Sequence, residues 1–105
     1  MGDTLMADIA PIHPGEILRE EFLVPLGLSV YALAKALGVP QTRMAEIVHE
    51  RRAVTADTAI RLGRFFKTSP EMWMNIQARF DLETALDAKG AEIEATVKPS
   101  DLIAA

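Results

Sequence analysis

The chain has 105 residues, which is enough for one small domain with a modest hydrophobic core. Half of the residues are hydrophobic, which indicates a folded chain rather than a disordered one. There is no cysteine, so disulfides and thiolate metal sites are excluded. Because the sequence also shows no long apolar run and no signal-peptide pattern, we expect a cytoplasmic protein that does not enter membranes.

The charge is distributed unevenly along the chain, although the formal net charge is only −4. Residues 29–67 contain seven basic and three acidic residues and carry a net charge of +4. Residues 1–28, with one basic and five acidic residues, and residues 68–105, with three and seven, each carry −4. Local potential rather than net charge steers a protein toward phosphate, so the middle third is the part suited to nucleic acid.

The first predicted helix begins near Pro14, after a flexible N-terminal segment at residues 1–11. We expect His13 to cap or border this helix, and Pro25 and Gly27 to stop it. Four apolar residues should form its buried face: Ile17, Leu18, Phe22 and Leu23.

Residues 29–52 predict two short helices joined by a tight turn. Ser29 is a plausible N-cap of the first of these helices, and Gly38 follows it where a left-handed residue is usual. Pro40 sits where the next helix can start. Two sets of apolar residues at helical spacing should face inward: Leu33, Ala34 and Leu37, then Met44, Ile47 and Val48.

This arrangement predicts a helix-turn-helix, in which the second helix enters the major groove of DNA. The residues that would then contact bases are Gln41, Thr42, Arg43 and Glu46. Gln and Arg can form paired hydrogen bonds with adenine and guanine, and the Thr methyl group can touch thymine. Candidates for phosphate contacts are Ser29, Tyr31, Lys35, Arg51 and Arg52. The alternative is an ordinary helical hairpin with solvated polar faces.

Two further helices are expected. The fourth follows Thr55, which we expect to be its N-cap by residue type, and carries the apolar residues Ala59, Leu62, Phe65 and Phe66. The fifth opens at Ser69-Pro70 and should stop at Gly90.

The apolar residues of the fifth helix divide into two sectors. One sector should cover the domain's own core: Met72, Trp73, Ile76 and Phe80. The other is our predicted dimer interface: Met74, Ala78, Leu82, Ala85 and Leu86. Alternatively, both sectors are buried within one chain, or one is loosely exposed. We place one domain at residues 12–89 and a C-terminal tail at 90–105, which could be frayed, a short strand or a partner-binding segment.

No enzyme motif is present, and we expect no enzymatic activity, cofactor, metal or small-molecule ligand. The two histidines, His13 and His49, have no ligand-spaced companions. His49 is better explained as a phosphate contact or surface residue.

The motifs HPGEIL at 13–18, EEFLVPLGLS at 20–29 and LAKALGVPQTRM at 33–44 resemble the HigA antitoxin family. This family is a branch of the XRE-type, lambda-repressor-like helix-turn-helix proteins that also includes virulence-associated protein I. The similarity continues through residues 55–83 and covers about residues 12–86. Two departures are Pro40, where a capping Ser or Thr is common, and His49-Glu50, where many relatives carry Asn-Gly.

The resemblance implies an all-α, five-helix domain that dimerises through its C-terminal helix. It also implies that the protein neutralises a HigB-type toxin, a small ribonuclease that cleaves messenger RNA, and represses its own operon by binding double-stranded operator DNA. The family's base-reading positions fall on Gln41, Thr42, Arg43 and Glu46. Two alternatives stay open: a stand-alone XRE-family regulator without a toxin, and an interaction module that no longer binds DNA.

Overall fold

The computed structural model describes residues 10–103. Most of the expected flexible segment, residues 1–9, and the last two residues of the expected tail lie outside this range. The described part of the chain is all-helical, with five helices and no strand, as the sequence predicted.

The first helix is continuous over three segments of different geometry. These are α2 (Pro14–Ile17), the π-helical η1 (Leu18–Leu23) and α3 (Val24–Leu26). The Val24 amide donates to the carbonyl of Arg19, five residues earlier, which widens the turn. This wider turn suits Pro25, whose ring would otherwise clash with a carbonyl one α-turn earlier. The prediction that Pro25 helps to stop the helix is therefore wrong, and the left-handed Gly27 alone ends it.

The remaining four helices begin where the sequence predicted. They are α4 (Val30–Leu37), α5 (Gln41–Val48), α6 (Ala56–Phe66) and α7 (Pro70–Thr96). The side-chain oxygens of Ser29, Thr55 and Ser69 each accept a hydrogen bond from a backbone amide three residues later. All three N-cap predictions are confirmed, because these oxygens satisfy donors that a helix start leaves free.

The last helix is longer than the sequence predicted. α7 passes through Gly90 and ends at Thr96, so the expected stop at Gly90 is wrong. A glycine inside a helix costs only about 1 kcal/mol relative to alanine, and Gly90 has good helix formers on both sides. The predicted boundary between domain and tail at residue 90 therefore falls inside a helix. Residues 97–103 follow it without a strand.

The hydrophobic core lies between the first helix, the α4–α5 pair, α6 and the beginning of α7. Its buried residues are Leu18, Leu23, Leu33, Ala34, Leu37, Met44, Ile47, Val48, Val54, Ala59, Leu62 and Trp73. Trp73 is completely buried, and its Nε1 donates to Thr68 Oγ1 at 2.9 Å. The inward-facing residues predicted for α4 and α5 are thus confirmed.

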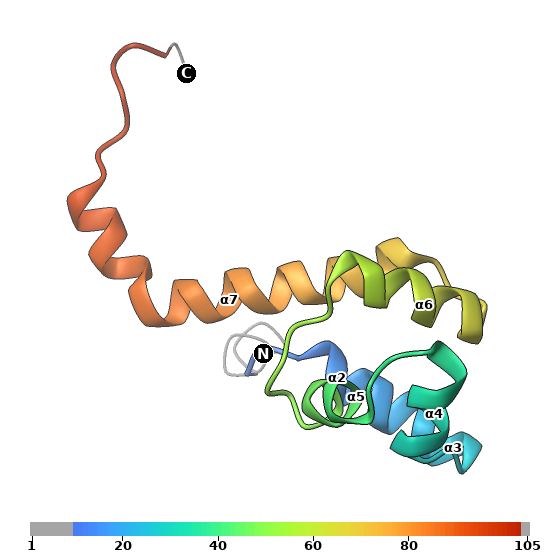
Figure 1. The fold of residues 1–105 in the computed structure, drawn as a ribbon. Coiled ribbons are helices and arrows are strands. Elements are labelled where there is room, and N and C mark those ends of the chain that lie inside the picture. Colours follow the sequence, from blue (N-terminus) through green and yellow to red (C-terminus); the bar gives the residue numbers. More distant parts are fainter. Residues whose placement is uncertain (1–9, 104–105) are drawn as a thin grey trace, which may run out of the picture.

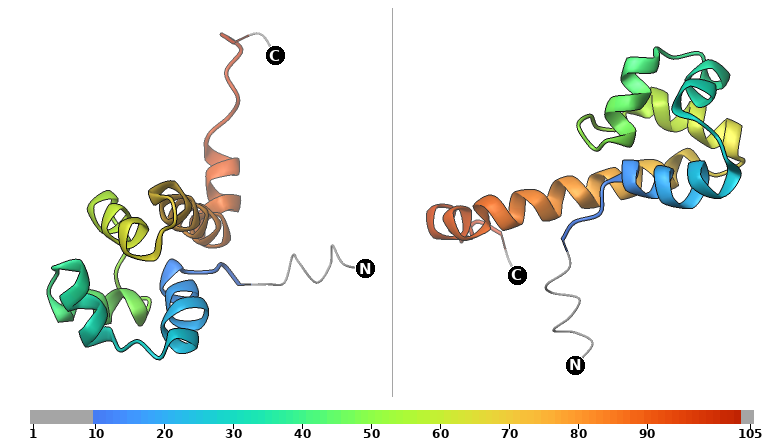
Figure 2. Two further views of the ribbon diagram at one scale, coloured as in Figure 1. Left: turned by 90° about the vertical axis from the view of Figure 1, so that its right-hand side faces the viewer. Right: turned by 90° about the horizontal axis from the view of Figure 1, so that it is seen from below.

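Helix α7 runs along the long axis of the molecule (Figure 1). Its N-terminal half packs on α6 and on the first helix, whereas its C-terminal part leaves the body and bends (Figures 1 and 2). The Cα radius of gyration is 17.3 Å, larger than the roughly 13 Å expected of a compact chain of this length. Among residues 10–103, no helix combines the length and apolarity needed to cross a membrane.

Candidate DNA interface

The turn between α4 and α5 is fixed by local hydrogen bonds. Gly38 has a φ of 72°, a left-handed conformation that only glycine adopts at little cost. The Val39 amide donates to the Ala34 carbonyl at 3.1 Å, across the end of α4. This is the Schellman arrangement, and it turns the chain sharply into α5. Pro40 occupies the N-cap of α5 without a side-chain capping bond, as its residue type requires.

The outer face of α5 carries the four predicted base-contacting residues. Met44, Ile47 and Val48 are buried, so the opposite face is turned outward. Gln41 and Thr42 are exposed at the N-terminal end of the helix, and Arg43 and Glu46 are half-buried. The structure brings all four together on one polar face, and their contact with bases stays a prediction.

Two of the predicted DNA-contacting residues, Arg52 and Glu46, form an ion pair with each other. Arg52 Nε donates to Glu46 Oε1 at 2.8 Å. Both side chains are about half exposed, so this ion pair contributes at most about 1 kcal/mol to stability. A phosphate that approaches Arg52 therefore has to compete with Glu46.

The other predicted phosphate contacts are spread over the same region. Tyr31 and Lys35 are exposed on α4, and Arg51 is exposed in the loop after α5. Ser29 is also exposed, but its Oγ already accepts the amide of Ala32 at 3.0 Å. The hydroxyl of Ser29 keeps its proton available as a donor.

A recess between α5 and α6 lies beside the predicted recognition face, which is the outward side of α5 with Gln41, Thr42, Arg43 and Glu46. It has a volume of about 420 Å³, and we call it the arginine recess; it is lined by Gly38, Val39, Arg43, Arg52, Ala53, Thr55, Asp57, Thr58 and Arg61. Asp57 accepts a hydrogen bond from Arg61 Nε at 2.8 Å and lies 3.7 Å from Arg43 Nη1. The hydrogen bond with Arg61 lowers the pKa of Asp57, so its carboxylate is ionised at neutral pH.

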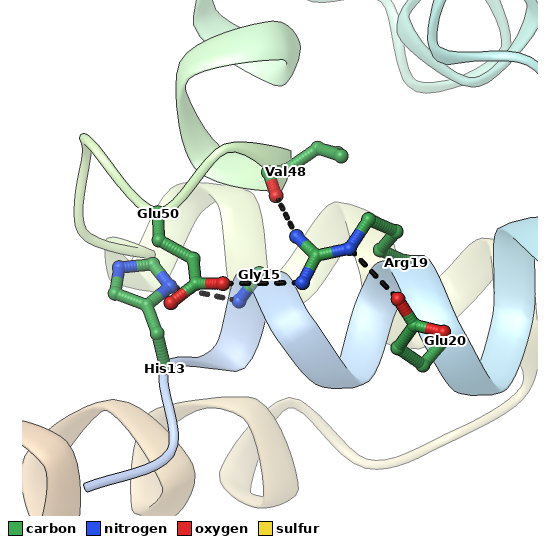
Figure 3. A network of polar contacts seen from close by, with 6 residues as sticks. All are labelled: His13, Gly15, Arg19, Glu20, Val48 and Glu50. Carbon is green, nitrogen blue, oxygen red and sulfur yellow. Dashed lines mark hydrogen bonds and ion pairs between the residues drawn. The ribbon is translucent and has the colours of Figure 1, made fainter. Parts of the chain in front are cut away.

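The loop after α5 is anchored to the first helix by Arg19 (Figure 3). Its Nη1 donates to the Val48 carbonyl at 2.6 Å, and its Nη2 donates to Glu50 Oε2 at 3.2 Å. Glu50 has a φ of 64°, which is uncommon for a residue with a side chain. The Glu50 carboxylate points to Arg19 and forms an ion pair with it.

The HPGE motif explains how α5 is held against the first helix. His13 Nδ1 accepts the amide of Gly15 at 2.8 Å and caps α2, as predicted (Figure 3). A Cβ on Gly15 would lie 1.9 Å from the Ile47 carbonyl oxygen, so only glycine permits this approach. The His13 ring is buried and meets Phe80 edge-on, with ring centroids 4.8 Å apart.

Burial lowers the pKa of His13 below its ordinary value of 6.5. The charges of Glu50 and Asp81 and the Arg52 backbone oppose this effect without reversing it. The neutral ring is also the form that has a free nitrogen to accept the Gly15 amide. His13 therefore has a structural role. Residues 10–103 contain no cluster of three or more potential metal ligands.

Several important polar residues were missed by the sequence analysis. Arg19, Asp57 and Arg61 position the helix-turn-helix, and the buried Gln77 accepts the amide of Val54 at 2.7 Å. The spacing of Asp57 and Arg61, four residues apart, could have indicated their pairing. The links of Arg19 to Glu50, 31 residues away, and of Gln77 to Val54, 23 residues away, leave no local signal.

The predicted dimer sector of α7 is exposed in the single chain. Its residues are Met74, Ala78, Leu82, Ala85 and Leu86. Leu82 is 61% exposed and Leu86 is 57% exposed. The alternative that both sectors are buried within one chain is therefore wrong. That a second copy covers this sector stays a prediction.

Comparison with known proteins identifies the class to which this fold and interface belong. The family model described as helix-turn-helix matches residues 18–73. Virulence-associated protein I of Dichelobacter nodosus is 55% identical over 78 residues, which cover 74% of this chain and 72% of that protein.

Two solved structures extend the comparison. The Pseudomonas aeruginosa antitoxin HigA with the higBA promoter is 52% identical, with a TM-score of 0.83 over 85% of this chain and 97% of that chain. The antitoxin GraA in complex with its operator is 48% identical, with a TM-score of 0.85 over 91% of this chain and 95% of that chain.

The chain therefore belongs to the helix-turn-helix family, in the branch that contains virulence-associated protein I and the HigA antitoxins. The resemblance found in the sequence is confirmed. This is a family of transcriptional regulators and antitoxins, so the prediction that the chain is not an enzyme is confirmed too.

Proposed function

We propose that this protein is the antitoxin of a type II toxin–antitoxin system and the repressor of its own operon. As a homodimer it binds double-stranded operator DNA through α5, and it neutralises a HigB-type ribonuclease toxin in the bacterial cytoplasm. The observation that carries the proposal is the outward polar face of α5, with Gln41 and Thr42 exposed beside Arg43. Relatives with this fold, solved with promoter and operator DNA, support it.

Dimerisation fits this function because helix-turn-helix dimers read two half-sites about one DNA turn apart. The exposed apolar sector of α7 supplies a surface that a second copy would bury. Burial of such apolar surface would stabilise the dimer by roughly 25 cal/mol for each Å² removed from water.

The charge distribution supports the proposal that DNA and toxin bind to different parts of the chain. The basic region, residues 29–67, includes the whole α4–α5 unit, whereas the two acidic ends would be repelled by phosphate. Acidic surfaces suit a small basic toxin, because complementary potentials raise the rate of encounter.

The test is binding of the purified protein to the promoter fragment of its own operon, across a salt series, with and without the product of the adjacent small gene. We expect specific binding that weakens steeply between low and moderate salt, and that changes when the second protein is added.

The second candidate is a stand-alone regulator, because the outward face of α5 serves a repressor equally well without a toxin. Specific binding that is indifferent to the second protein would favour it. A tight complex between the two proteins without specific DNA binding would contradict the repressor function and leave a scaffold.

A further inference from the structure

The arginine recess contains one carboxylate among three guanidinium groups. Arg43, Arg52 and Arg61 all line it, and Asp57 is the acidic residue in its wall. Arg52 is already paired with Glu46, so Asp57 is the counter-ion of the other two arginines. A carboxylate is unexpected at this place, because it opposes the attraction of phosphate to the surface.

Asp57 is held in place by Arg61, which also lines the recess. Arg61 donates from Nε to Asp57 Oδ1 and from Nη1 to the Leu37 carbonyl at the end of α4, both at 2.8 Å. The guanidinium thus joins α6 to the helix that precedes the turn. Because Arg61 is fixed at both ends, the carboxylate of Asp57 has a defined position.

Arg43 is the arginine of the cluster that lies near Asp57 without a hydrogen bond to it. Its Nη1 lies 3.7 Å from Asp57 Oδ1, close enough for charge attraction but too long for a hydrogen bond. The side chain of Arg43 is 34% exposed, so part of it is open to solvent. The attraction limits the directions that the guanidinium takes without occupying its donors.

We propose that Asp57 is a positioning residue that sets the sequence specificity of DNA binding through Arg43. It keeps the Arg43 guanidinium oriented toward base edges and away from nearby phosphates, and its own charge weakens binding to DNA of any sequence. This inference rests on the proposed function, since it concerns the same DNA interface.

A purely structural role for Asp57 makes a different prediction. The N-cap of α6 is Thr55, whose Oγ1 accepts the Thr58 amide, so the start of α6 does not depend on Asp57 for this bond. If Asp57 only stabilised α6, its replacement would lower the stability of the domain. The ratio of affinities for operator and unrelated DNA would then not change.

The experiment compares the wild-type protein with Asp57→Asn and Asp57→Glu. For each protein, affinity is measured over a salt series for two duplexes. One comes from the promoter of the protein's own operon, and the other is a shuffled duplex of the same length and composition. The matched control is Glu83→Gln, which also removes one negative charge and one i,i+4 pair with arginine, on a helix that does not line the recess. Thermal unfolding checks that all variants are folded.

For Asp57→Asn we expect tighter binding to the shuffled duplex and a promoter-to-shuffled affinity ratio lower by about fivefold or more, the size of one good base contact. The slope of log affinity against log salt for the shuffled duplex should steepen by about 0.9, because Arg43 is free to neutralise one more phosphate. Asp57→Glu should restore most of the ratio, and Glu83→Gln should keep it. Asp57→Asn in an Arg43→Ala background should have no further effect on the ratio.

An unchanged ratio in Asp57→Asn, with specific binding by the wild type, would overturn this inference and leave the proposed function standing. An equal loss of ratio in Glu83→Gln would also overturn it, since any lost charge would then suffice. If the wild-type protein does not distinguish the two duplexes, the proposed function fails, and the inference fails with it.

Discussion

At the scale of single residues, the contact between Gly15 and the Ile47 carbonyl determines how closely the first helix approaches α5. The approach is possible because position 15 has no side chain, and it places the recognition helix relative to the rest of the domain. His13 and Arg19 complete the attachment, one as a helix cap and the other through the Val48 carbonyl. None of these residues faces DNA in the proposed function, yet all three control the position of α5.

Replacing Gly15 with alanine should destabilise the domain. The added Cβ would lie 1.9 Å from a backbone oxygen, which cannot move as a flexible side chain can. We expect the free energy of unfolding in urea to fall by roughly 1–3 kcal/mol or more. The control is Gly90→Ala, where the new Cβ meets only Leu86 at ordinary distance and should raise stability by at most about 1 kcal/mol. If both variants are as stable as the wild type, the close approach of the first helix to α5 does not contribute to the stability of the domain.

Stability should also depend on pH through His13. Its pKa is lowered in the folded chain, so the unfolded chain binds more protons between the folded pKa and 6.5. The contribution of the neutral ring is fully present above pH 6.5 and is lost as the pH falls through the folded value. His13→Asn keeps a capping acceptor but cannot titrate in this range.

The measurement is urea unfolding of the wild type and His13→Asn from pH 8 to pH 5. We expect the wild type to lose stability relative to the variant as the pH falls. A difference between the two that is constant over this range would rule out His13 as the titrating group.

At the scale of the helix elements, the α4–turn–α5 unit combines a rigid turn with a polar outer face. The turn is set by Gly38 and the buried face by regular apolar spacing, so the sequence alone predicted both. The pairing of the outer residues was not predicted. Glu46 is held by Arg52, and Arg43 lies near Asp57, so the recognition face is preorganised by residues outside α5.

Arg43→Ala should weaken binding to the operator by roughly 1–3 kcal/mol and relax the preference at one base position. Its contact with Asp57 is long and largely solvated, so the stability of the domain should change little. Arg79→Ala, on α7, makes the same change in charge away from α5. Competition binding with a set of single-base operator variants measures the effect. An unaltered base preference would mean that Arg43 does not read the sequence.

At the scale of the whole molecule, the chain separates a basic central region from two acidic ends, and α7 extends beyond the body (Figure 2). The first half of α7 buries Trp73 and Gln77 against the domain. The other sector, with Leu82 and Leu86, is exposed within residues 10–103. A second copy would cover this sector and place two α5 helices on one DNA molecule.

Leu82→Glu should convert the proposed dimer to a monomer, because a charge would be buried at the centre of the interface. Sedimentation velocity over a range of protein concentrations measures the change. Ile93→Glu is the control, since Ile93 is also exposed on α7 but lies outside the predicted interface. A Leu82→Glu protein that sediments as a dimer would place the interface elsewhere.

The sequence by itself determined the features that depend on neighbouring residues. Ser29, Thr55 and Ser69 cap helices because the amides that they accept lie three residues ahead. The outward face of α5 followed from its apolar spacing for the same reason. The error at Gly90 has a local cause too, because the cost of one glycine is smaller than the gain from the good helix formers around it.

Only the tertiary structure decided which side chains meet across the fold. The contacts of Arg61 with Leu37, 24 residues away, and of Arg19 with Glu50 depend on how the helices cross, which no local spacing encodes. The left-handed conformation of Glu50 belongs to the same group, since Arg19 holds its carboxylate. The sequence could therefore predict α5 and its outward face, whereas the positions of its side chains depended on contacts between distant parts of the chain.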